Sequence, residues 1–131
     1  MQTLSRTFVF CIVTLFVVAL AAGCKPEAPA FQVNDIISDP GAFSGSLAVV
    51  GIVYAYAQDD ATLVGIMDKK ELQCTTPNCK KVLLPVKVAG ARPAIGDEVE
   101  AFGALAREPL GYLLRAERVQ VLASHNLGVP Q

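Results

Sequence analysis

Residues 46–57, SLAVVGIVYAYA, are the stretch on which the fold of this chain depends. Apolar side chains fall on both faces of the extended chain, with Leu47, Val49 and Val53 on one face and Val50, Ile52, Tyr54 and Tyr56 on the other. Gly51 lies at the centre, where a missing side chain lets a strand coil sharply. The stretch therefore predicts one long strand that serves two sheet surfaces of a small barrel.

Four more strands follow at intervals marked by turn residues. They are predicted at residues 61–68, 81–88, 97–106 and 112–122. The first two strands are joined by a turn at Gln58, Asp59 and Asp60, whose adjacent acids are turn residues rather than a catalytic pair. A Pro-containing turn over residues 90–96 precedes the fourth strand.

The alternation within these strands predicts which side chains face the core. In residues 81–88 the inward positions are Val82, Leu84, Val86 and Val88. Pro85 marks an edge or an opening in the ladder, because proline has no N–H to donate. In residues 97–106, Glu98 and Glu100 are expected to point outward, with Val99, Ala101 and Leu105 inward and a glycine, Gly103, at the centre. The apolar phase of residues 112–122 slips, which predicts a bulge near Glu117 or Arg118.

A short helical segment is predicted before the first strand. Asn34 is expected to cap a helix over residues 35–38, and Asp39 followed by Pro40 is typical of a second helix start. Gly45 is expected to end the segment. Residues 124–131 are expected to form a flexible C-terminal tail after the last strand.

The order and spacing of four short motifs resemble bacterial OB-fold proteins over residues 33–122. The motifs are DPxxFxG from Asp39, VGIV from Val50, LPV from Leu84 and GDEVxxxG from Gly96. The resemblance implies a mainly β domain at residues 32–123: a small five-stranded Greek-key barrel with a short N-terminal helical segment. The usual OB helix has no room in residues 89–96, so we expect the N-terminal helical segment to plug the barrel instead.

The OB resemblance also implies a binding module. Ligands of such barrels are expected across the second and third strands and the loops at residues 58–60 and 107–111. Candidate contacts combine flat apolar area with charge near that face: Tyr54, Tyr56, Lys69, Lys70, Lys87, Arg107 and Tyr112. In the alternative interpretation, the tyrosines cover a barrel edge and the lysines are solvated.

Residues 20–24, LAAGC, resemble the lipobox of bacterial lipoproteins. They end an apolar run that follows Arg6, and small residues precede Cys24. The resemblance implies that residues 1–23 are a signal peptide, that Cys24 carries diacylglyceryl and acyl chains such as palmitate, and that residues 24–31 are a lipidated tether. We expect a location in the cell envelope, anchored to a membrane and facing the periplasm. Aspartate after the lipidated cysteine resembles an inner-membrane retention signal, and this chain has Lys25 there. In a cell with two membranes we therefore expect the outer one.

Two cysteines remain for the domain. Cys11 leaves with the signal segment and Cys24 is the lipid site, so Cys74 and Cys79 form an even pair in an oxidising compartment. The intervening TTPN favours a tight turn, which predicts a disulfide. A redox dithiol and a zinc site are the alternatives, although a zinc site would need two more ligands.

Composition and motifs exclude several functions. Removal of residues 1–23 leaves ten Lys and Arg against twelve Asp and Glu, without the basic surplus of a nucleic-acid binder. We expect no enzyme activity and no cofactor, because no catalytic constellation is present and His125 is expected to be solvated. Periplasmic haem chaperones pair such a His with a Tyr four residues later, where this chain has Val129. The prediction is therefore a binding module for a small molecule or an envelope protein; the alternative is an assembly lipoprotein that docks a partner through a sheet edge near Pro85.

Overall fold

The computed structural model describes residues 29–74, 76 and 78–128. Its elements are β1 (Ala30–Gln32), α2 (Val33–Ser38), the 3-10 helix η1 (Pro40–Ala42), β2 (Ser46–Tyr56), β3 (Leu63–Met67), the 3-10 helix η2 (Lys69–Gln73), β4 (Leu83–Val88), β5 (Asp97–Glu108) and β6 (Gly111–Ser124). The fold is mainly β, as predicted, and α2 is the one α-helix among the described residues. No helix in this part of the chain is long and apolar enough to cross a membrane.

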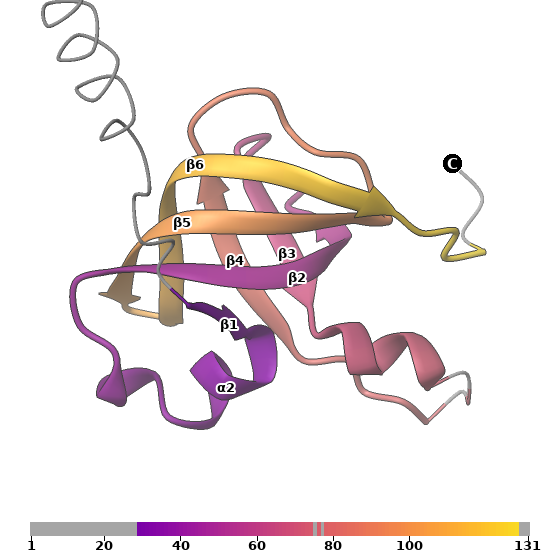
Figure 1. Cartoon of the computed structure of the whole chain (residues 1–131), viewed down its shortest axis with the longest axis horizontal. Helices are drawn as coiled ribbons and strands as arrows, with labels where there is room; N and C mark the ends of the chain where they lie inside the picture. The colour runs from indigo at the N-terminus through magenta and orange to yellow at the C-terminus, as the bar shows by residue number, and fades with distance from the viewer. Residues whose placement is uncertain (1–28, 75, 77, 129–131) are drawn as a thin grey trace, which may run out of the picture.

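The strands close into a barrel (Figure 1). The sheet order is β1-β2-β3-β4-β6-β5, and an additional pairing of β2 with β5 closes strands β2 to β6 into a ring. β1 is an extra strand that pairs in parallel with β2, and β4 pairs in parallel with β6. The remaining pairings are antiparallel. The five strands β2 to β6 thus form the small OB-like barrel that the sequence predicts.

β2 serves two surfaces of the barrel, as its apolar faces predict. Its first half, from Ser46 to Ile52, pairs with β5, and its second half, from Ile52 to Tyr56, pairs with β3. Gly51 lies near the change of partner. A Cβ at this position would lie 2.6 Å from Cγ2 of Val33 and 3.0 Å from Cδ1 of Ile66, so glycine is required by close packing.

The predicted bulge lies in β6. Phe102 of β5 pairs with Arg118, whereas the next residue, Gly103, pairs with Ala116, so Glu117 is the extra residue. The backbone of β6 presses on β5 here. A Cβ at Gly103 would overlap the carbonyl oxygen of Arg115 and lie 2.8 Å from Cα of Ala116.

Pro85 marks an opening in the ladder. β4 pairs with β3 from Leu83 to Lys87, but it pairs with β6 only from Val86 to Val88. Pro85 therefore lies where β4 has no β6 neighbour, which suits a residue without an N–H. The prediction that Val82 faces inward is wrong. Val82 precedes the strand, where the alternation has not begun, and it is 48% exposed.

The start of α2 differs from the prediction. Asn34 lies inside the helix rather than at its cap, and its backbone N–H donates to Oδ2 of Asp68 at 3.1 Å. The chain entering the helix is held by Asp35, whose Oδ2 accepts from the backbone N–H of Gln32 at 3.1 Å. Asp39 and Pro40 begin η1 as expected, and Gly45 follows it with a φ of 76°.

α2 contributes to the barrel core, as expected for a plug. Val33 and Ile36 are fully buried and belong to the same apolar cluster as side chains from β2 to β6. The helix lies across one end of the barrel (Figure 1). The other core members are Leu47, Val49, Val53, Val64, Ile66, Leu84, Val86, Val88, Val99, Ala101, Leu114 and Ala116.

Candidate functional site

The two candidate tyrosines of β2 have structural partners. Tyr56 donates from its hydroxyl to the carbonyl of Pro93 at 3.0 Å and accepts from the backbone N–H of Ile95 at 3.1 Å. The guanidinium of Arg92 lies 3.9 Å from the centre of its ring. Tyr56 therefore fastens the loop between β4 and β5. Tyr54 lies elsewhere on β2, with Nζ of Lys81 5.4 Å from its ring centre.

The other candidates are dispersed over the barrel. Lys69 and Lys70 are exposed on η2, and Arg107 is exposed in the β5–β6 hairpin, opposite Tyr112. The structure therefore does not bring the predicted contacts together. Lys87 lines one of the two hollows described below, and Tyr112 lines the other.

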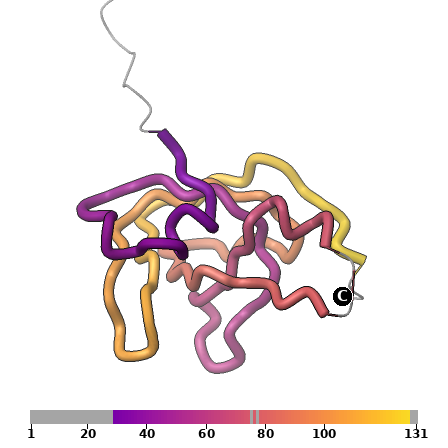
Figure 2. Tube along the Cα trace, turned by 90° about the horizontal axis from the view of Figure 1, so that it is seen from below, coloured from indigo at the N-terminus to yellow at the C-terminus, as the bar shows by residue number. Residues whose placement is uncertain are grey.

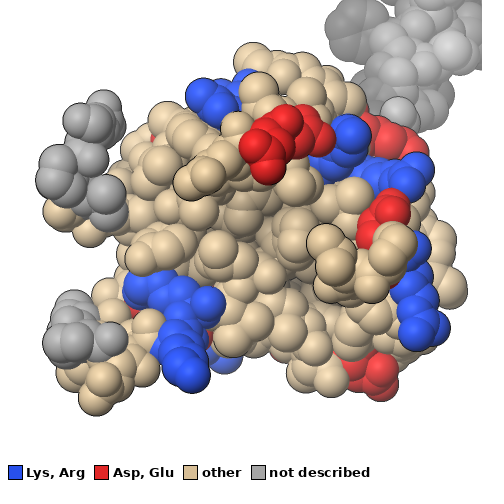
Figure 3. Space-filling model, turned by 180° about the vertical axis from the view of Figure 1, so that it is seen from behind, with Lys and Arg blue, Asp and Glu red and all other residues tan. Residues whose placement is uncertain are grey.

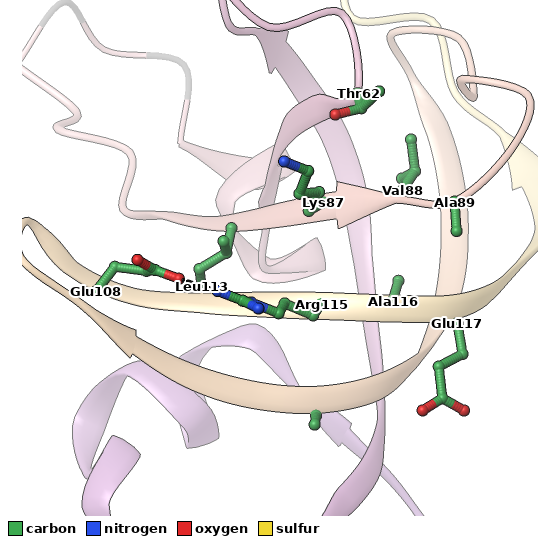
Figure 4. Close-up of a pocket in the computed structure, with 10 residues that line it drawn as sticks. Thr62, Lys87, Val88, Ala89, Glu108, Leu113, Arg115, Ala116 and Glu117 are labelled. Carbon is green, nitrogen blue, oxygen red and sulfur yellow. Dashed lines mark hydrogen bonds and ion pairs between the residues drawn. The ribbon is translucent and has the colours of Figure 1, made fainter.

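The larger hollow follows the seam between β4 and β6, and we call it the seam groove (Figure 4). Its volume is about 900 Å³, which is within the range of small-molecule sites. Small and apolar side chains contribute most of its floor, and charged side chains stand along it (Figure 4). Its residues are Thr62, Lys87, Val88, Ala89, Ala104, Glu108, Leu113, Arg115, Ala116 and Glu117.

Two cations lie side by side in the seam groove. Lys87 of β4 and Arg115 of β6 are directly opposite in the parallel register, and both side chains are more than half exposed, at 53% and 63%. Like charges in this arrangement repel. Each cation has an acid on its outer side: Lys87 lies 3.6 Å from Asp60, and Arg115 lies 2.6 Å from Glu108.

Asp60 is held by its own turn more than by Lys87. Its Oδ1 accepts from the backbone N–H of Thr62 at 2.9 Å and from the hydroxyl of the same residue at 2.6 Å. These hydrogen bonds lower the pKa of Asp60, and the charge of Lys87 adds a smaller contribution. Lys87 is therefore not tied to a short hydrogen bond, since 3.6 Å exceeds hydrogen-bond length.

The second hollow, of about 330 Å³, lies where β4 and β6 part, and we call it the apolar hollow. It is lined by Ile36, Ile37, Pro40, Leu83, Leu84, Pro85, Leu110 and Tyr112. Leu110 is fully exposed beside it. Its lining residue Pro85 is two positions before Lys87, which lines the seam groove on the same strand, β4.

Two loops project beside these hollows. The β2–β3 loop and the β5–β6 hairpin extend on one side of the molecule, and the described chain begins on the opposite side (Figure 2). The rear face has charged side chains of both signs around its periphery and an uncharged centre (Figure 3). No continuous basic surface crosses that face.

A second polar cluster forms around Glu98, which the sequence predicts to point outward. That prediction is wrong: Glu98 is buried, with 12% of its side chain exposed. It accepts from Nε2 of His125 at 2.7 Å and from Nζ of Lys69 at 2.9 Å. The hydrogen bond from His125, followed by that from Lys69, lowers the pKa of Glu98.

His125, which the sequence predicts to be solvated, is partly buried. Its side chain is 27% exposed, and its backbone N–H donates to the carbonyl of Gly96 at 2.8 Å. The Glu98 cluster thus joins the end of β6, the start of β5 and η2. A carboxylate can only accept, so Nε2 of His125 carries the shared proton.

The disulfide closes the loop after η2. Cys74 and Cys79 are at disulfide distance, with their Cα atoms 6.1 Å apart. Lys81 donates from Nζ to the carbonyl of Glu71 at 2.9 Å, which fastens the same loop. The described residues contain no group of three or more His, Cys, Asp or Glu side chains placed to hold a metal.

Sequence reasoning misses most of the seam groove. Arg115 and Glu108 are ordinary exposed positions in a predicted strand and its turn, and nothing in the sequence places Arg115 opposite Lys87. The register of two parallel strands that are far apart in the chain decides this. Asp68 is also missed; it is fully buried, and it accepts from the backbone N–H groups of Asn34 and Lys70.

No protein-family model matches the chain, and no curated protein is detectably similar to it.

Proposed function

We propose that this protein is a lipid-anchored, non-enzymatic binding module of the cell envelope, and that its OB-like barrel binds a ligand in the seam groove. The observation that carries the proposal is the groove itself, a hollow of about 900 Å³ on a barrel face whose lining combines apolar side chains with two adjacent, half-exposed cations. OB barrels bind ligands beside the loop after their first strand and the loop before their last. Thr62 and Glu108 bring those two loops to this groove.

The proposed anchor is compatible with this position of the groove. Cys24 lies outside the described residues, and the described chain begins at Pro29, a few residues later. It enters the barrel on the side away from the two projecting loops (Figure 2). A short tether at that side would leave the two projecting loops on the side away from the attachment point. Two acyl chains would hold the protein stably on a membrane.

Replacement of Cys24 tests the anchor. Cys24→Ser is expected to abolish incorporation of labelled palmitate and to leave the precursor unprocessed. Lys25→Ser, which leaves the proposed lipid site intact, is the matched control and should retain the label. Labelled, processed protein from the Cys24→Ser variant would contradict the proposal.

A paired screen tests the binding function. A thermal-shift screen of charged small molecules is run beside crosslinking and capture from envelope extracts, each with the wild type and with Lys87→Gln. A hit that depends on Lys87 supports the seam groove. Binding that is unchanged in Lys87→Gln but abolished in Lys80→Gln, a variant on the disulfide loop, would place the ligand outside the seam groove.

A partner-docking function is the second candidate, and one observation favours it. Pro85 is exposed, and the first residues of β4 lack a β6 neighbour, so backbone groups beside this opening can meet a partner strand. A captured protein that crosslinks next to Pro85, without any small-molecule hit, would favour assembly. Salt-sensitive binding of single-stranded DNA would favour nucleic-acid recognition, and a haem stain would test the haem chaperone alternative.

A further inference from the structure

The two hollows differ in chemistry but lie along one seam. β4 and β6 pair at Val86–Leu114, Lys87–Arg115 and Val88–Ala116, and they part before Val86. The seam groove lies over the paired part and the apolar hollow lies over the parted part. Pro85 and Lys87 are two residues apart on β4, so roughly 7 Å of extended chain separates the two environments.

The charged end favours an anion. Lys87 and Arg115 repel each other, and a carboxylate or phosphate between them would accept from both. Lys87 is the more available cation, because its contact with Asp60 is 3.6 Å long and Asp60 is already bonded to Thr62. A ligand anion that binds Lys87 therefore has only the weak contact with Asp60 to displace.

The parted end favours an alkyl chain. Its side chains are apolar apart from the hydroxyl of Tyr112, and they extend from exposed Pro85 and Leu110 to Ile36 and Leu84 in the core. The opening exists because β6 does not continue the ladder beside the first residues of β4. A volume of about 330 Å³ exceeds what one or two water molecules need, and the side chains around it offer water few hydrogen bonds.

We propose that the ligand is an anionic amphiphile, with its carboxylate or phosphate between Lys87 and Arg115 and a single alkyl chain in the apolar hollow. This inference rests on the proposed function, and it names the ligand class of that same groove. A cationic head between Lys87 and Arg115 would meet two like charges, because Asp60 and Glu108 each pair with one of these cations from outside the gap. The carboxylate of Glu117, which also lines the groove, points away from both cations (Figure 4). The alkyl chain supplies the affinity that two half-exposed cations cannot supply alone.

Calorimetric titration of the unacylated mature chain, residues 24–131 with Cys24→Ser, tests this inference. The probes are octanoate, octyl phosphate, octylammonium and octanol, each below its micelle concentration. Octanoate and octyl phosphate are expected to bind, and the tighter of the two identifies the head group. Affinity should rise about fourfold per methylene from hexanoate until the hollow is full.

Variants separate the two ends. Lys87→Gln and Arg115→Gln are each expected to lower the affinity for octanoate about three- to tenfold. The increase of affinity with chain length should be unchanged in both variants. Leu110→Gln, at a fully exposed position, should reduce the gain per methylene instead. Lys80→Gln on the disulfide loop is the control and should bind like the wild type.

The outcomes distinguish this inference from the proposed function. Equal binding of octylammonium, or no dependence on chain length, would overturn the amphiphile assignment. If the paired screen still finds a ligand that depends on Lys87, the groove remains the binding site and only its ligand class is wrong. If neither the probes nor the screen gives binding that depends on Lys87 or Arg115, both proposals fail.

Discussion

Truncation of Leu114 tests whether β6 closes the barrel where the seam groove is built. Leu114 is fully buried and pairs with Val86 of β4 and Leu105 of β5, whereas Leu110 in the neighbouring turn is fully exposed. Leu114→Ala and Leu110→Ala remove the same atoms from positions a few residues apart. The difference in stability between the two variants therefore reports the burial of Leu114, since the side-chain atoms removed are the same.

The structure sets the expected magnitudes. Truncation of a fully buried leucine costs about 2–5 kcal/mol of the free energy of unfolding, from lost transfer free energy and the cavity left behind. We expect about 3 kcal/mol for Leu114→Ala, which lowers Tm by about 12–24 °C in a domain of this size. Leu110→Ala should change the free energy of unfolding by less than about 0.5 kcal/mol.

Urea unfolding followed by circular dichroism measures both free energies. The slope with denaturant should be unchanged in both variants, so that the midpoints can be compared directly. Equal midpoints for the two variants would refute the closed barrel at this seam. If Leu114→Ala loses stability but its affinity for fatty acids still rises with chain length, the apolar hollow persists in the destabilised barrel.

Three further predictions concern other parts of the barrel. Gly103→Ala is expected to lower the free energy of unfolding by about 3 kcal/mol or more, because the added Cβ would overlap the backbone of the neighbouring strand β6. Gly41→Ala is the control and should be near neutral, since the atom nearest to its Cβ would lie at 3.7 Å. Similar unfolding midpoints for the two variants would contradict the bulge geometry. Glu98 has a lowered pKa in the folded state, so its contribution to stability is present above its ordinary pKa of 4.5 and is lost as pH falls through the folded value. Glu98→Gln should therefore be less stable at pH 7 and lose less stability on acidification, and parallel curves of unfolding free energy against pH would count against the cluster. Replacement of Cys74 and Cys79 together by serine should cost about 2 kcal/mol and leave the circular dichroism spectrum unchanged; two alkylatable thiols in freshly isolated wild type would argue against the bond.

The barrel could be predicted because local patterns and turn residues agree. The two apolar faces and central glycine of residues 46–57 require a strand buried on both sides, and the structure pairs that strand with β3 and β5. The phase slip near Glu117 and the position of Pro85 likewise predict the bulge and the opening. Each of these features is determined by neighbours in the sequence.

The site could not be predicted, because it depends on long-range register. Glu98 alternates with inward positions and so should face water, yet Lys69 and His125 from distant segments reach it and satisfy its charge in the interior. Tyr54 and Tyr56 have the composition of a binding surface, but other loops use them as packing partners. The adjacency of Lys87 and Arg115 arises only when two parallel strands pair.

Amide NMR with a bound probe shows which strands of the barrel contact the ligand. Titration of residues 24–131 carrying Cys24→Ser with octanoate should shift amide resonances of residues 83–89 and 110–117, on both sides of the seam, and leave those of η2, Lys69–Gln73, unchanged. Saturable shifts confined to the two seam strands are the predicted result. Shifts that cluster on η2 and the disulfide loop, with the seam unaffected, would contradict the assignment of the groove as the binding site.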